Sequence, residues 1–140
     1  MNWTEDRGSF ILRLAPGEQV MASILSFAAE HGIEGAEVRA IGAVDQARVG
    51  YFLREEKRYD VKEFDGNMEV VSLLGNLART DAGLFVHAHI ALGRADFSLV
   101  GGHLVEATVS VTMEVFLRPV PAGLERDVDP RFNLKLLKLG

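Results

Sequence analysis

The sequence predicts an α+β fold in a single domain over residues 1–140, with one principal helix at residues 18–31 packed on a sheet. Two observations lead to this fold class. Only one stretch repeats its apolar residues at helical spacing, whereas most of the remaining chain alternates apolar and polar residues between turn-forming residues. No linker or internal repeat divides the chain. We therefore expect a largely antiparallel, twisted sheet of about seven or eight strands.

A first strand is expected at residues 10–14, because Pro16 and Gly17 follow it and proline cannot continue a central ladder. The predicted helix comes next, with Glu18 in its first turn, where a negative charge suits the helix dipole. His31 is expected to end the helix, since Gly32 tolerates the left-handed conformation found after many helices. The apolar residues at helical spacing are Val20, Ile24, Phe27 and Ala28.

Strands are expected over most of the remaining chain. Residues 36–53 suggest two strands with a turn near Asp45-Gln46, and Asp65-Gly66-Asn67 is a hairpin signal between residues 58–64 and 68–79. Two further strands are expected at 84–93 and 96–105, with a bulge or close backbone approach at Gly101-Gly102. The pattern at 132–139 leaves a short strand and a short helix both open. The clearest alternation places one set of side chains on a single face: Ala107, Val109, Val111, Met113, Val115 and Leu117.

Composition excludes several classes of protein. The formal net charge is −5 and no basic run occurs, so direct DNA binding is disfavoured. No apolar run is long enough to span a membrane, and the first ten residues carry acids without the apolar core of a secretory signal. The sequence contains no cysteine, so a transition-metal site would have to use histidine with aspartate or glutamate. We expect a cytoplasmic protein.

Three of the four histidines fall within 17 residues: His87, His89 and His103. Residues i and i+2 of a strand point to the same face, so His87 and His89 stand side by side, with Cα atoms about 6–7 Å apart. His103 can approach them if the following strand folds back. Three convergent imidazoles suit zinc or another divalent transition metal with one coordination position open. The alternative, three unrelated histidines in packing or edge positions, stays open at this point.

Five further residues are candidates for positions around such a site. Imidazole ligands usually donate their second N–H to a carboxylate or carbonyl, which makes Glu69, Glu114 and Asp96 candidates for that contact. Arg79 and Arg94 are candidates for pairing with the charge of a bound carboxylate or carbonyl ligand. Each of the five also has an ordinary surface role as an alternative. No phosphate-binding glycine motif or nucleophile elbow occurs, so a covalent hydrolase has little support.

The segments GSFILRLAPGEQVMASILSFAAEHGI, AIGAVDQARVGYF, MEVVSLLGNLA, HAHIAL, GGHL and TMEVFL resemble the PPC domain, the plant and prokaryote conserved domain, from about residue 8 to residue 139. This resemblance implies a trimer of subunits with one helix on an antiparallel sheet. Prokaryotic members carry a DNA-binding label by analogy with plant proteins, but the basic hook of the plant proteins is missing from this sequence. The architecture is also similar to that of acetolactate decarboxylase, in which an HxH pair and a later histidine hold zinc.

Two functional hypotheses follow. The first is a homotrimer with a three-histidine metal site that acts as a small-molecule lyase or hydrolase, or as a metal-dependent binding protein. The second is a non-enzymatic, DNA-associated or regulatory assembly module in which the histidines form a structural cluster. The sequence assigns neither a substrate nor a reaction.

Overall fold

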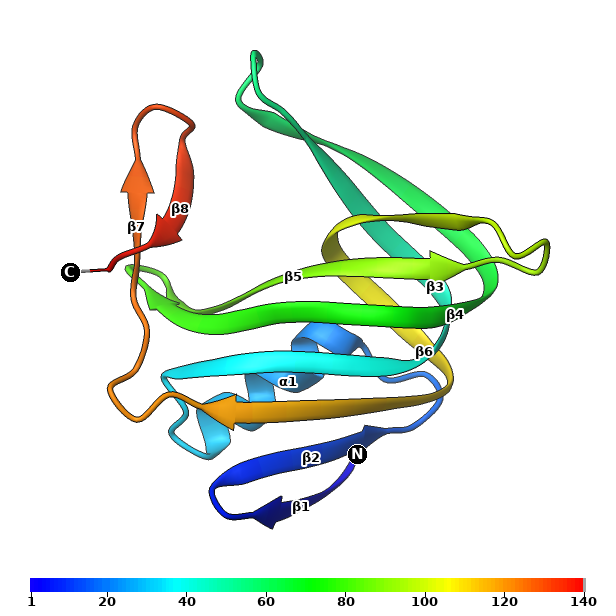
Figure 1. Ribbon diagram of the computed structural model, residues 1–140, viewed down its shortest axis with the longest axis horizontal. Coiled ribbons are helices and arrows are strands. Elements are labelled where there is room, and N and C mark those ends of the chain that lie inside the picture. The colour runs from blue at the N-terminus through cyan, green and yellow to red at the C-terminus, as the bar shows by residue number, and fades with distance from the viewer. Residues whose placement is uncertain (140) are drawn as a thin grey trace.

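The computed structural model describes residues 1–139 and confirms the α+β class, with one helix and eight strands in the described chain. Six strands form the main sheet and two form a small separate sheet near the C-terminus (Figure 1). The elements in chain order are β1 Asn2–Asp6, β2 Ser9–Leu14, α1 Val20–Glu30, β3 Gly35–Leu53, β4 Arg58–Thr80, β5 Gly83–Gly93, β6 Leu99–Pro119, β7 Arg126–Asp129 and β8 Leu134–Leu137.

The main sheet is antiparallel throughout and partly closes on itself. Its strand order is β1-β2-β6-β3-β4-β5, and the first half of β6 also pairs with β5. Strands β3 to β6 therefore form a closed ring of hydrogen-bonded neighbours, whereas β1 and β2 extend the sheet beyond the second half of β6. The closure places residues from the ends of β5 and the beginning of β6 beside each other.

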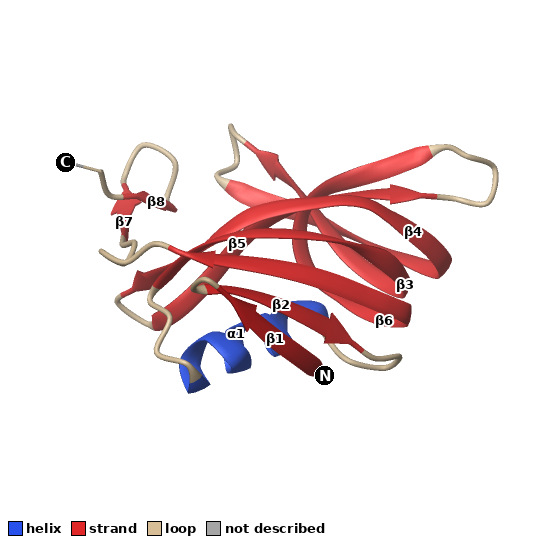
Figure 2. Cartoon of the chain, turned by 60° about the horizontal axis from the view of Figure 1, so that its bottom comes forward, coloured by secondary structure: helices blue, strands red, loops and turns tan. Residues whose placement is uncertain are grey.

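The helix lies against one face of the sheet and fills the core (Figure 2). It buries an apolar face of five residues, of which Ile24 and Phe27 have no exposed surface. Burial of a side chain of this size contributes about 1.5–3 kcal/mol, so this face accounts for much of the stability of the helix, which is only 11 residues long. The buried helical residues are Val20, Met21, Ile24, Phe27 and Ala28.

The negative charge at the start of the helix comes from a different residue than expected. Glu18 precedes the helix, where it accepts a hydrogen bond from the N–H of Ala15 at 2.6 Å. The side chain of Glu106 on β6 accepts hydrogen bonds from the first-turn N–H groups of Met21 and Ala22, at 2.7 and 3.1 Å. A tertiary contact thus satisfies the helix N-terminus, which no local sequence pattern could indicate.

Both turns expected inside residues 36–79 are wrong. The chain continues as strand through Asp45-Gln46 within β3 and through Asp65-Gly66-Asn67 within β4. The β3–β4 register instead shifts at Val44/Gln46, which marks a bulge, and Gly66 has a φ of +95°. Bulges and turns draw on the same residue types, and here pairing along both long strands favours the bulge. The two strands project as a long hairpin whose turn lies between β3 and β4 (Figure 1).

The expected alternation along β6 holds with one exception. Ala107, Val109, Met113, Val115 and Leu117 are buried, but Val111 is 63% exposed. Val111 lies where the β3–β6 register shifts between Gly42 and Val44, so the side chain leaves the core face there. The C-terminal segment resolves as strand β8 rather than as a helix. No helix in the described part of the chain is long and apolar enough to cross a membrane.

Candidate metal centre

His87 and His89 extend from the same face of β5, as their spacing predicts. The alternate residues of this strand, Val86, Ala88 and Ile90, are buried in the core, so both imidazoles lie on the opposite side. Gly75 of β4 pairs with Ala88, and a Cβ at Gly75 would lie 2.2 Å from the carbonyl oxygen of His87. The missing side chain at Gly75 therefore lets β4 approach the backbone that carries His87.

His103 of β6 joins the pair because β6 folds back on β5. His89 and His103 are direct partners in the β5–β6 ladder. The expected close approach occurs beside them, because a Cβ at Gly101 would lie 2.2 Å from the carbonyl oxygen of Ile90. The three ring centroids are 5.1–5.7 Å apart, and one nitrogen from each ring lies within 4.8 Å of the others. The convergence expected from strand geometry is confirmed.

The environment of His87 and His103 favours neutral imidazole, the form that binds metal. Burial and the nearby charge of Arg126 lower the pKa of His87 to about 4. Burial also lowers the pKa of His103. Moreover, Nδ1 of His103 is buried and has no hydrogen-bond partner in the described chain. A buried ring nitrogen without a partner costs free energy unless something binds it.

These donors fit a transition-metal ion. Imidazole nitrogens bind zinc at about 2.0–2.1 Å, which places tetrahedral donors about 3.4 Å apart. Since the nitrogens here lie within 4.8 Å of one another, small side-chain rotations would bring them to that separation. The rings are half-buried or exposed and lie outside the hydrophobic core. Three nitrogen ligands leave one position for water or a ligand.

Arg126, the first residue of β7, adds a cation that the sequence analysis missed. Only 8% of its surface is exposed, and its guanidinium donates hydrogen bonds to the carbonyl of Lys135 at 2.7 Å and to Oδ1 of Asn76 at 2.8 Å. It also lies 3.2 Å from Nδ1 of His87. Tyr59 lies beside His103, and the two rings are stacked with their centroids 4.5 Å apart. No local sequence motif marks Arg126, because only the tertiary fold brings it next to the histidines.

A pocket of about 160 Å³ opens beside two of the three histidines. Its lining residues come from β7, β8 and the turn between them on one side, and from β4, β5 and β6 on the other. Its volume is well below the roughly 300–1,000 Å³ of pockets that hold drug-sized ligands. The lining residues are Tyr59, Phe85, His87, His103, Arg126, Asn133, Leu134, Lys135 and Leu136.

The three candidate carboxylates have other surroundings. Glu69 and Glu114 are exposed and line a separate hollow together with Ile41 and Val111. Asp96 accepts two hydrogen bonds from Ser98, from its N–H at 3.0 Å and its hydroxyl at 2.6 Å, in the turn between β5 and β6. Within residues 1–139, none of these acids is hydrogen bonded to a histidine of the cluster.

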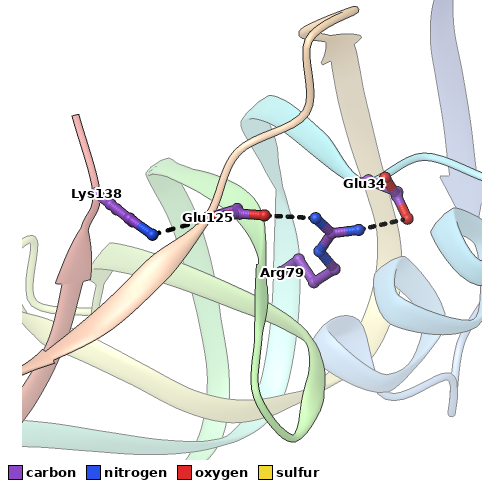
Figure 3. A network of polar contacts seen from close by, with 4 residues as sticks. All are labelled: Glu34, Arg79, Glu125 and Lys138. Carbon is purple, nitrogen blue, oxygen red and sulfur yellow. Dashed lines mark hydrogen bonds and ion pairs between the residues drawn. The ribbon is translucent and has the colours of Figure 1, made fainter. Parts of the chain in front are cut away.

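The two candidate arginines are also engaged elsewhere. Arg94 lies over the ring of Phe64 at 5.6 Å. Arg79 bridges Glu34, at 3.2 Å, and Glu125, which also faces Lys138 (Figure 3). The N–H of Arg79 in addition donates to the carbonyl of Leu124 at 2.7 Å. Arg79 thus ties the segment leading into β7 to β4 and helps to position Arg126.

The family model of the Plants and Prokaryotes Conserved (PCC) domain matches residues 4–121 of this chain. A metal-containing protein from Archaeoglobus fulgidus is 36% identical, with a TM-score of 0.87 over 99% of this chain and 97% of that chain. A plant- and prokaryote-conserved protein from Pyrococcus horikoshii is 33% identical, with a TM-score of 0.87 over 99% and 95%. No curated protein matches the sequence.

Other structures share the fold at lower identity. A protein from Bacteroides thetaiotaomicron, described as a candidate for DNA binding, is 25% identical, with a TM-score of 0.94 over 98% of this chain and 96% of that chain. A Staphylococcus aureus protein of unknown function, described as similar to alpha-acetolactate decarboxylase, has a TM-score of 0.54 and 14% identity over 75% of this chain and 50% of that chain. At that identity, the likeness concerns the fold alone.

Proposed function

The chain belongs to the Plants and Prokaryotes Conserved domain family, and we propose that it is a metal-dependent protein whose ion is held by His87, His89 and His103. The observation that carries the proposal is the convergence of one nitrogen from each ring within 4.8 Å, with Nδ1 of His103 buried and unpartnered. The similarity to a metal-containing archaeal protein at 36% identity supports it. Zinc is the ion that we propose, because three imidazoles without thiolate suit it.

The residues of the chain limit the chemistry of the site. The low pKa of His87 keeps that ring neutral at pH 7 without a bound ion, so little proton release is needed for ligation. A bound zinc ion would supply Lewis acidity toward a carbonyl or carboxylate ligand at its open position. The small adjoining pocket limits that ligand in size. We propose a small carbonyl- or carboxylate-bearing molecule, bound or converted by a lyase or hydrolase reaction.

Metal analysis tests this proposal. Protein purified without a histidine tag and loaded with zinc is expected to hold about one ion per chain, and His89→Ala is expected to lose it. His31→Ala is the matched control, because His31 stacks on Phe27 at the end of the helix, remote from the cluster, and should retain the ion. Equal metal content in the His89→Ala variant and the wild type would contradict the proposal.

We also propose that the chain assembles as a homotrimer. An exposed apolar group on β3, β4 and β6 supports self-association, since Ile41, Val71 and Val111 are each more than half exposed and line one hollow. Light scattering on the eluting protein should give three times the 15.4 kDa mass of one chain. A monomeric mass that does not change with concentration would contradict this proposal.

A second candidate function is a DNA-associated regulatory module. The likeness to a protein described as a candidate for DNA binding favours it, whereas the net charge of −5 opposes direct binding. A mobility-shift assay at low salt distinguishes the two, because the electrostatic part of DNA binding is strongest there. No shift at low salt would reject direct DNA binding.

A further inference from the structure

Arg126 is a buried cation without a negatively charged partner in the described chain. Its three recorded hydrogen-bond partners are the carbonyl of Lys135, the amide oxygen of Asn76 and the ring nitrogen of His87, all of them uncharged acceptors. Its Nε is buried and makes no hydrogen bond. An arginine buried this deeply is normally paired with a carboxylate, because desolvation of the charge is costly.

The groups around Arg126 do not supply the missing charge. The side chain of Lys135 pairs with Asp81, an exposed residue at the turn before β5. Tyr59 is half-buried and offers a phenol rather than a carboxylate. The guanidinium consequently gives this side of the pocket a positive charge that an incoming anion can neutralise.

The rest of the pocket has the opposite character. Phe85, Leu134 and Leu136 line it together with the ring of Tyr59. A ligand that matches this pocket has a charged head beside Arg126 and a short apolar body. The volume of about 160 Å³ suits a small molecule better than a nucleotide or a polymer segment, and the apolar wall disfavours a phosphate, which would be charged on all sides.

We propose that Arg126 binds the carboxylate of a short, apolar monocarboxylate in this pocket, next to the three-histidine cluster. Guanidinium groups hold carboxylates through charge-assisted hydrogen bonds. Arg126 lines the pocket, and its Nη1 makes one hydrogen bond although it carries two N–H groups. The inference deepens the proposed function, because it names the class of ligand. It rests on that function for the contact between the ligand and the metal ion. Arg126 replaces Arg79 and Arg94 as the residue expected to pair with the ligand.

Calorimetric titration with butyrate tests the inference. Zinc-loaded wild-type protein should bind butyrate at least about 10-fold more tightly than butyramide, which has a similar shape but no charge. Arg126→Gln should weaken butyrate binding by at least about 10-fold, and Arg126→Lys should restore part of the affinity. Arg131→Gln is the matched control, since Arg131 is an exposed arginine of the same C-terminal hairpin that pairs with Asp129, and it should bind butyrate as the wild type does.

The outcomes separate this inference from the proposed function. Equal affinity for butyrate and butyramide in the wild-type protein overturns the inference even if the Arg126→Gln variant fails to fold. Equal butyrate affinity in folded Arg126→Gln and wild-type protein overturns it too. Metal content is measured on the same samples and alone decides the metal centre. Butyrate binding that depends on Arg126 in protein that holds no zinc would support the inference and contradict the metal centre.

Discussion

Replacement of Gly75 by alanine should damage both the fold and the metal centre. A Cβ at this position would lie 2.2 Å from the carbonyl oxygen of His87 and 2.7 Å from the Cα of Ala88. Real Cβ atoms almost never approach another atom within 3.0 Å, so β5 would have to move away from β4 by at least 0.8 Å. The obstacle is backbone, which cannot rotate aside as a flexible side chain can.

The size of the effect follows from two opposing contributions. Overpacking of a tight site costs about 1–3 kcal/mol, and contact with backbone places this case near the upper end. Alanine regains about 0.5–1 kcal/mol over glycine in a strand. We expect a net loss of about 2 kcal/mol in the free energy of unfolding, which for a domain of this size lowers Tm by about 7 °C. The shift of His87 should also weaken zinc binding by about 10-fold or more.

Thermal unfolding by circular dichroism, at one fixed protein concentration, measures the change in Tm, and zinc titration measures the affinity. Gly93→Ala is the matched control, because it lies in the same strand pair and its nearest neighbour would be a methyl carbon of Val71 at 3.3 Å, which can rotate. A Tm of Gly75→Ala within about 1 °C of the wild type, with unchanged zinc affinity, would refute the close-packing argument.

Two further predictions concern the surroundings of the cluster. In metal-free protein, the pKa of His87 is about 4, below its unfolded value of 6.5. Between these two pH values the unfolded chain binds more protons than the folded chain. The free energy of unfolding should therefore fall as the pH is lowered from 6.5 to 4. His87→Asn should flatten this decline in urea titrations; an equally steep decline in the variant would contradict the assignment. Arg79→Gln should speed hydrogen exchange in residues 126–137, because it removes the bridge between Glu34 and Glu125, while the control Arg39→Gln should leave that exchange unchanged. Equal exchange in Arg79→Gln and the wild type would show that the bridge does not hold the hairpin.

The sequence was sufficient for the three histidines because their convergence depends on local geometry. The period of two along a strand puts His87 and His89 on one face, and the short connection to β6 brings His103 next to His89. Neither step depends on the rest of the fold. The burial of Val86, Ala88 and Ile90 on the other face was implied by the same period.

The long strands show where this local reasoning fails. Asp65-Gly66-Asn67 has the composition of a hairpin turn, yet residues on both sides stay paired with β3. Gly66 does adopt a positive φ, as a turn would require, but it bends the strand without reversing it. What decides between a bulge and a turn is the presence of a long partner strand, and that information lies elsewhere in the chain.

The place of Arg126 beside the histidines could not be predicted from the sequence either, because it too depends on distant parts of the chain. It follows Glu125 in a segment without periodicity, and that segment pairs with Arg79 of β4, which is distant in the sequence. The residues that the sequence offered for the same task, Arg79 and Arg94, lie near the histidines along the chain but not in this pocket. In the fold, residue 126 lies closer to His87 than chain distance suggests, because the C-terminal hairpin returns to the open face of β5.

The distribution of charge also bears on the choice between the two proposed functions. Seven of the 15 lysines and arginines already face a carboxylate of the same chain: Arg39, Arg48, Arg58, Arg79, Arg131, Lys135 and Lys138. DNA affinity grows with the number of phosphates that free cations neutralise, and an acid beside each cation opposes that gain. Arg126 cannot contribute, because it is buried beside the histidines. The charges of this chain therefore disfavour direct DNA binding, whereas the three-histidine site needs only residues that this chain already brings together.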